Sequence, residues 1–381
     1  MTHRVVIVGG GTGGTVLANR LVDALGTSLR SGEATVTLVT DSPNHVYKPV
    51  FLYVAFGLRE VADGVRPVRD LLDRRVELVV DEVVEIDTDR KRLTGRTGRA
   101  DRGYDTLVLA TGSRLVPETV PGLVEGGHWF YSAEGAERLR DALAGFEGGH
   151  LVLSVVGVPH MCPPAPIEFV LMADAWFRER GLRDDVELTY TYPIQRAHGI
   201  ESLAEWATDA FEARDITLRT FVNPDRVDPE AGALHTMEGE TLDYDLLVTI
   251  PPHAGAELVE RSGLGDDGWV AVDHHTLAVE GAEDVYAIGD TADVPTSKAG
   301  SVAHYEAGVV ASRIASRVRG RTPTATYDGK TVCFVESGLD EATFLEFGYG
   351  EVPTVRAASR TLHWSKLGYN ESYWLTARGL V

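Results

Sequence analysis

Two cysteines, Cys162 and Cys333, are the residues of this chain best suited to nucleophilic or redox chemistry. Cys162 lies in the turn GVPHMCPPAP (157–166), directly before a helical pattern, and a helix N-terminus lowers the pKa of a thiol. Cys333 lies in the strand-like run TYDGKTVCFVESG (326–338). Buried cysteines are more often small apolar side chains, but these are the only two in 381 residues. Their number and spacing predict neither a disulfide scaffold nor a metal site, so any shared function requires that the fold bring them together.

A glycine-rich turn at the start of the chain predicts a nucleotide site. The run VVIVGGGTGG (5–14) places Gly9, Gly11 and Gly14 in the spacing G-x-G-x-x-G between an apolar strand and the helical run TVLANRLVDAL (15–25). Such glycines permit a tight turn and close approach of a pyrophosphate to the helix N-terminus. The alternative is a tight strand–helix turn without a ligand, so the dinucleotide has to be identified from other segments.

Two further segments favour FAD as that dinucleotide. The run YDTLVLATG (104–112) ends a buried strand in a small-residue turn, and AEDVYAIGD (282–290) delivers Gly289 and Asp290 to a helix start, where a carboxylate can bind a ribityl hydroxyl. Together with the first turn they form a set typical of FAD proteins that have two dinucleotide-binding domains. Six other candidate cofactor contacts are Thr40, Asp41, Pro49, Thr111, Gly112 and Lys298. For Lys298, a solvated lysine at a helix start is an equal alternative.

A second strand–turn–helix unit over 150–181 repeats the first without its glycines. Prolines remove N–H donors and do not tolerate the tight glycine turn, so a second pyrophosphate site is not expected. The predicted fold is α/β, with two Rossmann-like dinucleotide-binding domains and a C-terminal α+β membrane-facing segment. The FAD domain takes residues 1–115 and 265–320, the second domain 116–264 with Cys162, and the C-terminal region 321–381 with Cys333.

The amino-acid composition limits the kinds of binding partner and the cellular location that we expect. A net charge of −21 argues against nucleic acid, and so acidic a surface favours a halophilic source, the alternative being an ordinary acidic protein. We expect no membrane span and no signal peptide, which favours the cytoplasmic face. The apolar segment NHVYKPVFLYVAFG (44–57) is expected as a loop over a ring system or as core packing. The aromatic, locally basic end 360–381 predicts a segment at a membrane surface, with a packed helix or a homo-oligomer contact as alternatives.

Several of these segments together resemble the sulfide:quinone oxidoreductase family, over essentially the whole chain. The segments are VVIVGGGTGG, NHVYKP, CPPAP followed by Glu168, VTIPP, DVYAIGD with VPTSK, and TPTATYDGKTVCFVESG. The resemblance implies an FAD enzyme in which Cys162 and Cys333 take sulfur from sulfide, electrons pass to FAD, and a membrane quinone reoxidises the flavin. It also implies proton handling by Glu168 and His198, although a loop histidine without a function is an equal alternative for His198. Aromatic candidates for lining the quinone site are Phe334, Phe344, Phe347 and Trp364.

The sequence departs from this family pattern in two places. Where some members have a third cysteine, the stretch HWFYSAE (128–134) has Tyr131 and Ser132, and the C-terminal tail is shorter than in many members. Three alternatives remain at this point. They are a type II NADH:quinone oxidoreductase, a sulfide dehydrogenase with a cytochrome acceptor, and a non-catalytic sulfur carrier or redox sensor.

Overall fold

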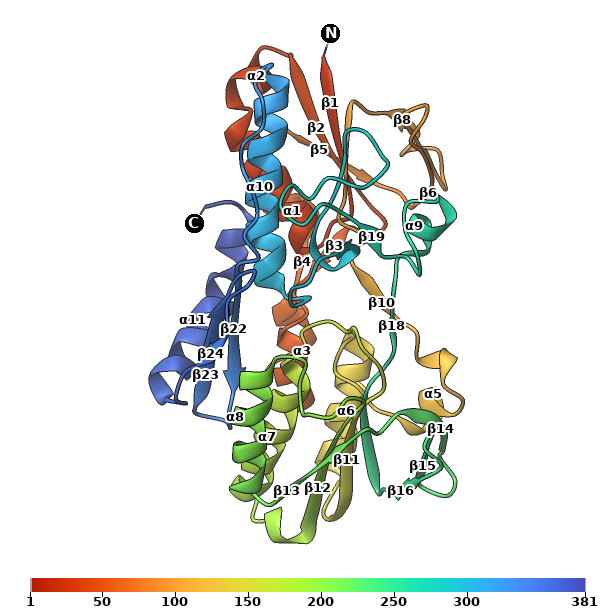
Figure 1. The fold of residues 1–381 in the computed structure, drawn as a ribbon, viewed down its shortest axis with the longest axis vertical. Helices are drawn as coiled ribbons and strands as arrows, with labels where there is room; N and C mark the ends of the chain where they lie inside the picture. The colour runs from red at the N-terminus through yellow and green to blue at the C-terminus, as the bar shows by residue number, and fades with distance from the viewer. Residues whose placement is uncertain (1, 381) are drawn as a thin grey trace.

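The computed structural model describes residues 2–380, and its backbone is organised around two parallel sheets (Figure 1). The first sheet has the strand order β20-β9-β1-β2-β5. Its strands are β1 (His3–Val8), β2 (Ala34–Thr40), β5 (Val76–Val80), β9 (Thr106–Leu109) and β20 (Val285–Ala287). The last four residues of β1 are valines and an isoleucine, and all four are buried, as expected for a strand covered on both faces. Helices α1 (Thr12–Ala24) and α10 (Gly300–Val318) pack against each other beside this sheet.

The second sheet lies at the opposite end of the molecule in Figure 1 and has the order β13-β12-β11-β17. Its strands are β11 (Gly149–Val155), β12 (Val186–Tyr192), β13 (Ile216–Thr220) and β17 (Leu246–Ile250). Helices α6 (Ala133–Ala144), α7 (Ala165–Glu179) and α8 (Glu201–Glu212) accompany it. The chain crosses between the halves through the antiparallel pair β10 (Ser113–Leu115) and β18 (His253–Gly255). The predicted boundaries at 115 and 264 lie at or shortly after these crossings.

Short elements complete the two halves. A small antiparallel sheet interrupts the first half between β5 and β9, with strands β6 (Val83–Asp87), β7 (Arg92–Gly95) and β8 (Arg102–Gly103). The others are α2 (Gly26–Arg30), β4 (Val65–Pro67), α4 (Val68–Leu71), α5 (Leu123–Gly126), β14 (Pro224–Asp228), β15 (Ala233–Thr236), β16 (Thr241–Asp243), α9 (Glu257–Arg261), β19 (Val270–Ala271) and β21 (Ala292–Asp293).

The apolar segment 44–57 forms a strand and a helix, so the expectation of a loop was wrong and the alternative, core packing, is confirmed. β3 (Asn44–Val46) pairs with β4, and α3 (Val50–Ala55) follows Pro49. All six residues of α3 are buried, and the helix packs against α6 of the second half. Burial of an entirely apolar helix between the two halves therefore outweighs the loop signals of this segment.

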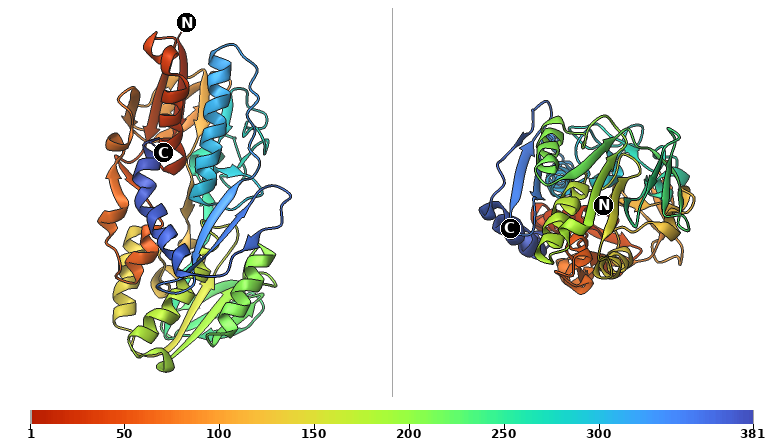
Figure 2. Two further views of the ribbon diagram at one scale, coloured as in Figure 1. Left: turned by 90° about the vertical axis from the view of Figure 1, so that its left-hand side faces the viewer. Right: turned by 90° about the horizontal axis from the view of Figure 1, so that it is seen from below.

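The C-terminal region adds a three-stranded antiparallel sheet and a long helix. They are β22 (Thr331–Glu336), β23 (Ala342–Phe347), β24 (Thr354–Val355) and α11 (Arg360–Ala377). Figure 2 shows this region running along the molecule across the junction of the halves, with α11 ending near α1. The Ser359 hydroxyl caps α11 by accepting the Leu362 N–H. Within residues 2–380, none of the helices has the length and apolarity required to cross a membrane.

Candidate functional site

The main pocket, with a volume of about 420 Å³, is lined by residues of both halves and of the C-terminal region. The turns that follow β1, β2, β9 and β20 form one side, and the turn before α7 forms another. Strand β22 and helix α11 complete the wall. The carboxyl ends of parallel strands converge here, which is where open α/β sheets bind their ligands.

The three glycines of the first turn have different structural roles. A Cβ on Gly9, whose φ is 117°, would lie 2.2 Å from the Ala110 carbonyl oxygen, and one on Gly14 would lie 1.9 Å from the Gly9 carbonyl oxygen. These two glycines are therefore required for the turn and for packing. A Cβ on Gly11 would meet nothing within 4 Å, and Gly11 lines the pocket. Only Gly11 keeps open a space that a ligand can use.

Most of the predicted cofactor contacts line this one pocket. They are Gly9, Gly11, Thr40, Asp41, Pro49, Thr111, Gly112, Gly289, Asp290 and Lys298. Gly14 is the exception, since it is buried behind the turn. Segments that are far apart in the sequence therefore meet at one place, as the three-part set of motifs predicts.

Asp290 and Lys298 both form some of their side-chain hydrogen bonds with other groups of the protein. The Ser113 hydroxyl donates to the Asp290 carboxylate over 3.1 Å, and burial raises the pKa of that carboxyl. The Lys298 ammonium donates to the backbone carbonyls of Asp290 at 2.9 Å and Ala292 at 3.3 Å. Asp290 thus keeps acceptor capacity for a hydroxyl group, whereas the Lys298 ammonium already has two acceptors.

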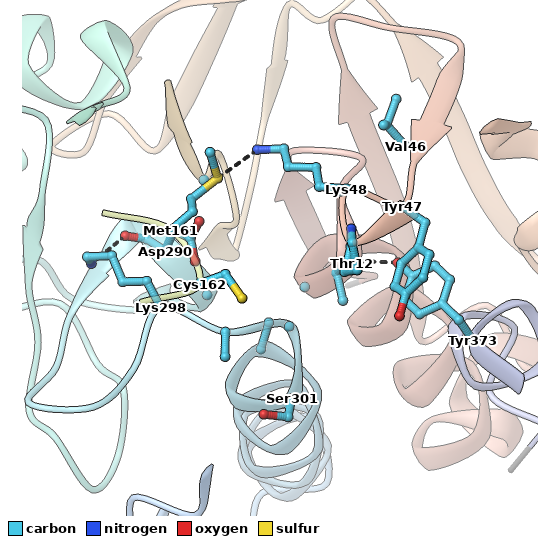
Figure 3. Close-up of a pocket in the computed structure, with 18 of the residues that line it drawn as sticks. Thr12, Val46, Tyr47, Lys48, Met161, Cys162, Asp290, Lys298, Ser301 and Tyr373 are labelled. Atoms are coloured by element: carbon cyan, nitrogen blue, oxygen red, sulfur yellow. Dashed lines mark hydrogen bonds between the residues drawn. The ribbon is translucent and has the colours of Figure 1, made fainter. Parts of the chain in front are cut away.

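Lys48 is a cation on the pocket wall that the sequence did not single out, although it belongs to the quoted NHVYKP segment. Its ammonium donates to the Met161 sulfur over 3.0 Å, across the pocket in Figure 3. Desolvation of the ammonium group within the pocket lowers the pKa of Lys48. A thioether is a weak acceptor, so an electron-rich group placed in this pocket would gain a charge-assisted hydrogen bond. With the open space at Gly11 and the carboxylate of Asp290, Lys48 makes the pocket fit for FAD.

Both cysteines line the same pocket, one from the turn before α7 and the other from β22. Cys162 has a positive φ of 44°, and its N–H donates to the Lys298 carbonyl over 2.9 Å. A positive φ in a non-glycine residue is strained and is often found at functional sites. Figure 3 shows the Cys162 sulfur on the side of the pocket close to α10.

The expected lowering of the Cys162 pKa is wrong. Burial raises it, and the nearby Glu168 carboxylate raises it further. Burial likewise raises the pKa of Cys333, to about 12. The turn before α7 offers little compensation, because Pro163, Pro164 and Pro166 have no N–H. Both thiols are therefore protonated at neutral pH until a base or a bound cofactor changes their surroundings.

Glu168 lies on the pocket wall and is paired with Lys366 of α11. Its Oε1 atom also accepts the backbone N–H of Glu336 over 2.8 Å. Lys366 is itself buried and lines the pocket, so it does not belong to an exposed basic surface of the tail, as the sequence suggested. The sequence lacked any signal for this pair, since its members are far apart in the chain.

His198 is not among the residues that line the pocket. It lies buried in the loop before α8, where its Nδ1 atom accepts the Ile200 N–H over 2.9 Å. Burial lowers its pKa to about 3. The structure therefore brings Glu168 to the cysteines but leaves His198 outside the pocket.

Of the four aromatic candidates, Phe334 alone lines the pocket. Phe344 lies behind it with ring centroids 4.9 Å apart, and Phe347 and Trp364 are absent from the wall. Tyr369, which the sequence analysis did not choose, lines the pocket with its ring 5.9 Å from that of Phe334 and is 39% exposed. The i, i+3 spacing from Lys366 to Tyr369 would have placed both on one helix face.

Three comparisons relate the chain to known proteins. It is 27% identical over 363 residues to the mitochondrial sulfide:quinone oxidoreductase of Mus musculus, covering 92% of this chain and 79% of the relative. It is 31% identical over 301 residues to an NADH dehydrogenase-like protein of Mycobacterium tuberculosis, covering 76% of this chain and 72% of that one. The structure of the Aquifex aeolicus sulfide:quinone oxidoreductase superposes with a TM-score of 0.86 at 21% identity, covering 99% and 92% of the two chains, and shows the same fold.

The sequence model of the pyridine nucleotide-disulphide oxidoreductases matches residues 3–158 and 172–314. The two matched stretches leave out 159–171, the segment that holds Cys162 and Glu168. The match includes both sheets and the pocket turns that follow β1, β2, β9 and β20. The chain therefore belongs to the pyridine nucleotide-disulphide oxidoreductase family, and its cofactor is FAD.

Proposed function

We propose that the chain is a sulfide:quinone oxidoreductase that holds FAD in the main pocket. One observation carries this proposal: both cysteines lie in the wall of the pocket that the FAD motifs also form. FAD supplies a two-electron acceptor there. Cys162 and Cys333 bind the sulfur of the hydrosulfide ion, and the sulfur leaves as a polysulfide or as elemental sulfur.

The protein groups around the cysteines have defined tasks in this proposal. Because burial raises the pKa of both thiols, the reaction requires a base, and Glu168 is the carboxylate that lines the pocket beside them. Its acidity is adjusted by two opposing effects, since burial raises the pKa of Glu168 and the Lys366 ammonium lowers it. Since the net effect raises the pKa of Glu168, this carboxylate is a stronger base than an exposed one and is suited to accept a proton from a thiol.

The second candidate function, an NADH:quinone oxidoreductase, is favoured by the NADH dehydrogenase-like relative. It requires a pyrophosphate site at the turn before α7. There the N–H groups of Cys162 and Ala165 already donate to the carbonyls of Lys298 and Cys162. With proline at 163, 164 and 166, this helix start has few free donors for a phosphate. The turn therefore favours sulfide over NADH as the electron source.

The quinone enters at α11, and the same face contacts the membrane surface. Tyr369 lines the pocket and is also partly exposed, so the cavity reaches the outside beside this helix. Trp364 is 69% exposed and Leu375 is 46% exposed on α11, a composition that suits a lipid interface. Vesicle flotation tests the contact, with reduced binding expected for Trp364→Ser.

The experiment that tests the function is anaerobic absorbance of the flavoprotein, with sulfide and NADH added to separate samples. We expect sulfide to bleach the flavin and NADH to leave it oxidised. Bleaching by NADH alone would overturn the proposal in favour of the second candidate.

The acceptor is tested on the sulfide-reduced protein. Decylubiquinone or menaquinone is expected to restore the flavin absorbance and to sustain steady turnover. A failure with both quinones, together with oxidation by a cytochrome, would identify a sulfide dehydrogenase instead. Absence of turnover with either acceptor would indicate a sulfur carrier or redox sensor.

A further inference from the structure

A line of buried ionisable groups connects the cysteine pocket with the outside of the molecule. It starts at Glu168, on the pocket wall, and continues through Lys366 of α11 to Glu336, the last residue of β22. It ends at His363, whose side chain is 13% exposed. We propose that this line is the path by which a proton from water reaches the pocket, with His363 as its outer end.

The contacts along the line are those of a proton relay. The His363 Nδ1 atom lies 2.9 Å from the Glu336 Oε2 atom, and the Tyr53 hydroxyl donates to Glu336 Oε1 over 2.7 Å. The Lys366 ammonium lies 3.9 Å from Glu336 Oε1 and is hydrogen-bonded to Glu168. A short swing of this lysine towards Glu336 closes the only gap in the line.

The burial of these ionisable groups indicates that they do more than stabilise the fold. Glu336 is fully buried, and it takes part in contacts with three side chains that can carry a proton. Taking several ionisable groups out of water is costly, and apolar residues of similar size often stabilise a core as well or better. Water cannot reach Glu336 directly, so protons pass through its partners.

The proposal rests on the proposed function, because the balanced reaction requires a proton from solution. Hydrosulfide and a quinone react as HS⁻ + Q + H⁺ → S + QH₂. The two electrons of the sulfide go to the quinone, and the sulfide contributes only one of the two protons that the quinol carries. The second proton comes from water in each turnover, and it enters through His363, Glu336 and Lys366.

The decisive variant is His363→Gln, measured in separate half-reactions. Glutamine can still donate a hydrogen bond to Glu336 but cannot take up a proton. We expect reoxidation of the reduced flavin by decylubiquinone to slow by about tenfold, while reduction by sulfide changes by less than about twofold. The matched control is His235→Gln, a histidine on β15 that is not among the pocket residues and contacts Thr241. It is expected to react as the wild type does in both steps.

A structural role of His363 is separated from proton transfer by chemical rescue. His363→Ala leaves a space beside Glu336 that imidazole can fill, so added imidazole is expected to restore the reoxidation rate. A slow variant that imidazole does not rescue would overturn the proposal, and so would a His363→Gln protein that reoxidises at the wild-type rate. The proposed function is tested independently, because wild-type protein that sulfide does not bleach would fail before this step.

Discussion

The turn after β1 and the turn after β11 occupy equivalent places in the two parallel sheets, but they present different groups to the pocket. The first has glycines, which bring backbone close to the cofactor, and it leaves open space at Gly11. The second has three prolines and Cys162, and its N–H groups bond to carbonyls of the protein. The second turn thus presents a thiol to the pocket, whereas the first leaves open space there.

The two halves also differ in the groups that surround a buried carboxylate. Glu306, on α10 of the first half, accepts the Gly289 N–H and has no cation among its hydrogen-bonded partners. Glu168, on α7 of the second half, is paired with Lys366. Burial raises the pKa of both carboxyls, but only Glu168 has an opposing positive charge in contact. Glu306 holds the turn at Gly289 and does not line the pocket, whereas Glu168 lies on the pocket wall.

The largest expected effect on the reaction rate comes from removing one of the two thiols. Cys333→Ser removes a nucleophile that lines the pocket and leaves the glycine turn untouched. Reduction of the flavin by sulfide, measured by anaerobic stopped-flow absorbance, is expected to fall by about 100-fold or more, or roughly 2.7 kcal/mol. FAD content, measured in the same samples, is expected to stay unchanged. Reduction at the wild-type rate would show that Cys333 is not required.

A matched pair of glycine substitutions compares the two turns directly. A Cβ at Gly11 or at Gly157 would meet nothing within 4 Å, so neither Gly11→Ala nor Gly157→Ala clashes with the protein. Gly11→Ala places a methyl group in the cofactor space and is expected to weaken FAD binding by about tenfold. Gly157→Ala is expected to bind FAD as the wild type does. Equal FAD affinities of the two variants would contradict the assignment of the first turn.

The remaining two predictions concern the two carboxylates and are measured as changes in stability, not in activity. The pKa of Glu306 is raised to about 8 in the folded protein, above its ordinary value of 4.5, so its contribution to stability is lost as pH rises from 5 towards 8. Glu306→Gln does not ionise. Its melting temperature is therefore expected to exceed that of the wild type increasingly over this range, by on the order of 3 °C at pH 8.

Glu168→Gln is expected to act in the opposite direction. It leaves the buried Lys366 ammonium without its nearest partner and is expected to lower the free energy of unfolding at neutral pH by about 3 kcal/mol. Chemical denaturation of both variants in parallel makes the comparison. A stabilised Glu168→Gln protein would mean that the ion pair is a net cost to the fold.

The sequence by itself determined the parallel sheets and the FAD motifs and singled out the two cysteines, because these depend on local patterns and residue types. An apolar strand followed by G-x-G-x-x-G predicts its own turn, and proline excludes a second such turn wherever the chain leads. The cysteine turn, Asp290 and the glycines could therefore be named from residue types and spacing alone.

Only the tertiary structure decided which side chains meet and how their charges behave. Lys366 looked like part of a basic surface, but α11 packs it against Glu168 in the pocket, and His198 lies outside the pocket despite its place in the predicted site. The thiol pKa values rise because burial outweighs the helix terminus. Burial and long-range pairing depend on how distant segments fold together, so no local pattern of residues could reveal them.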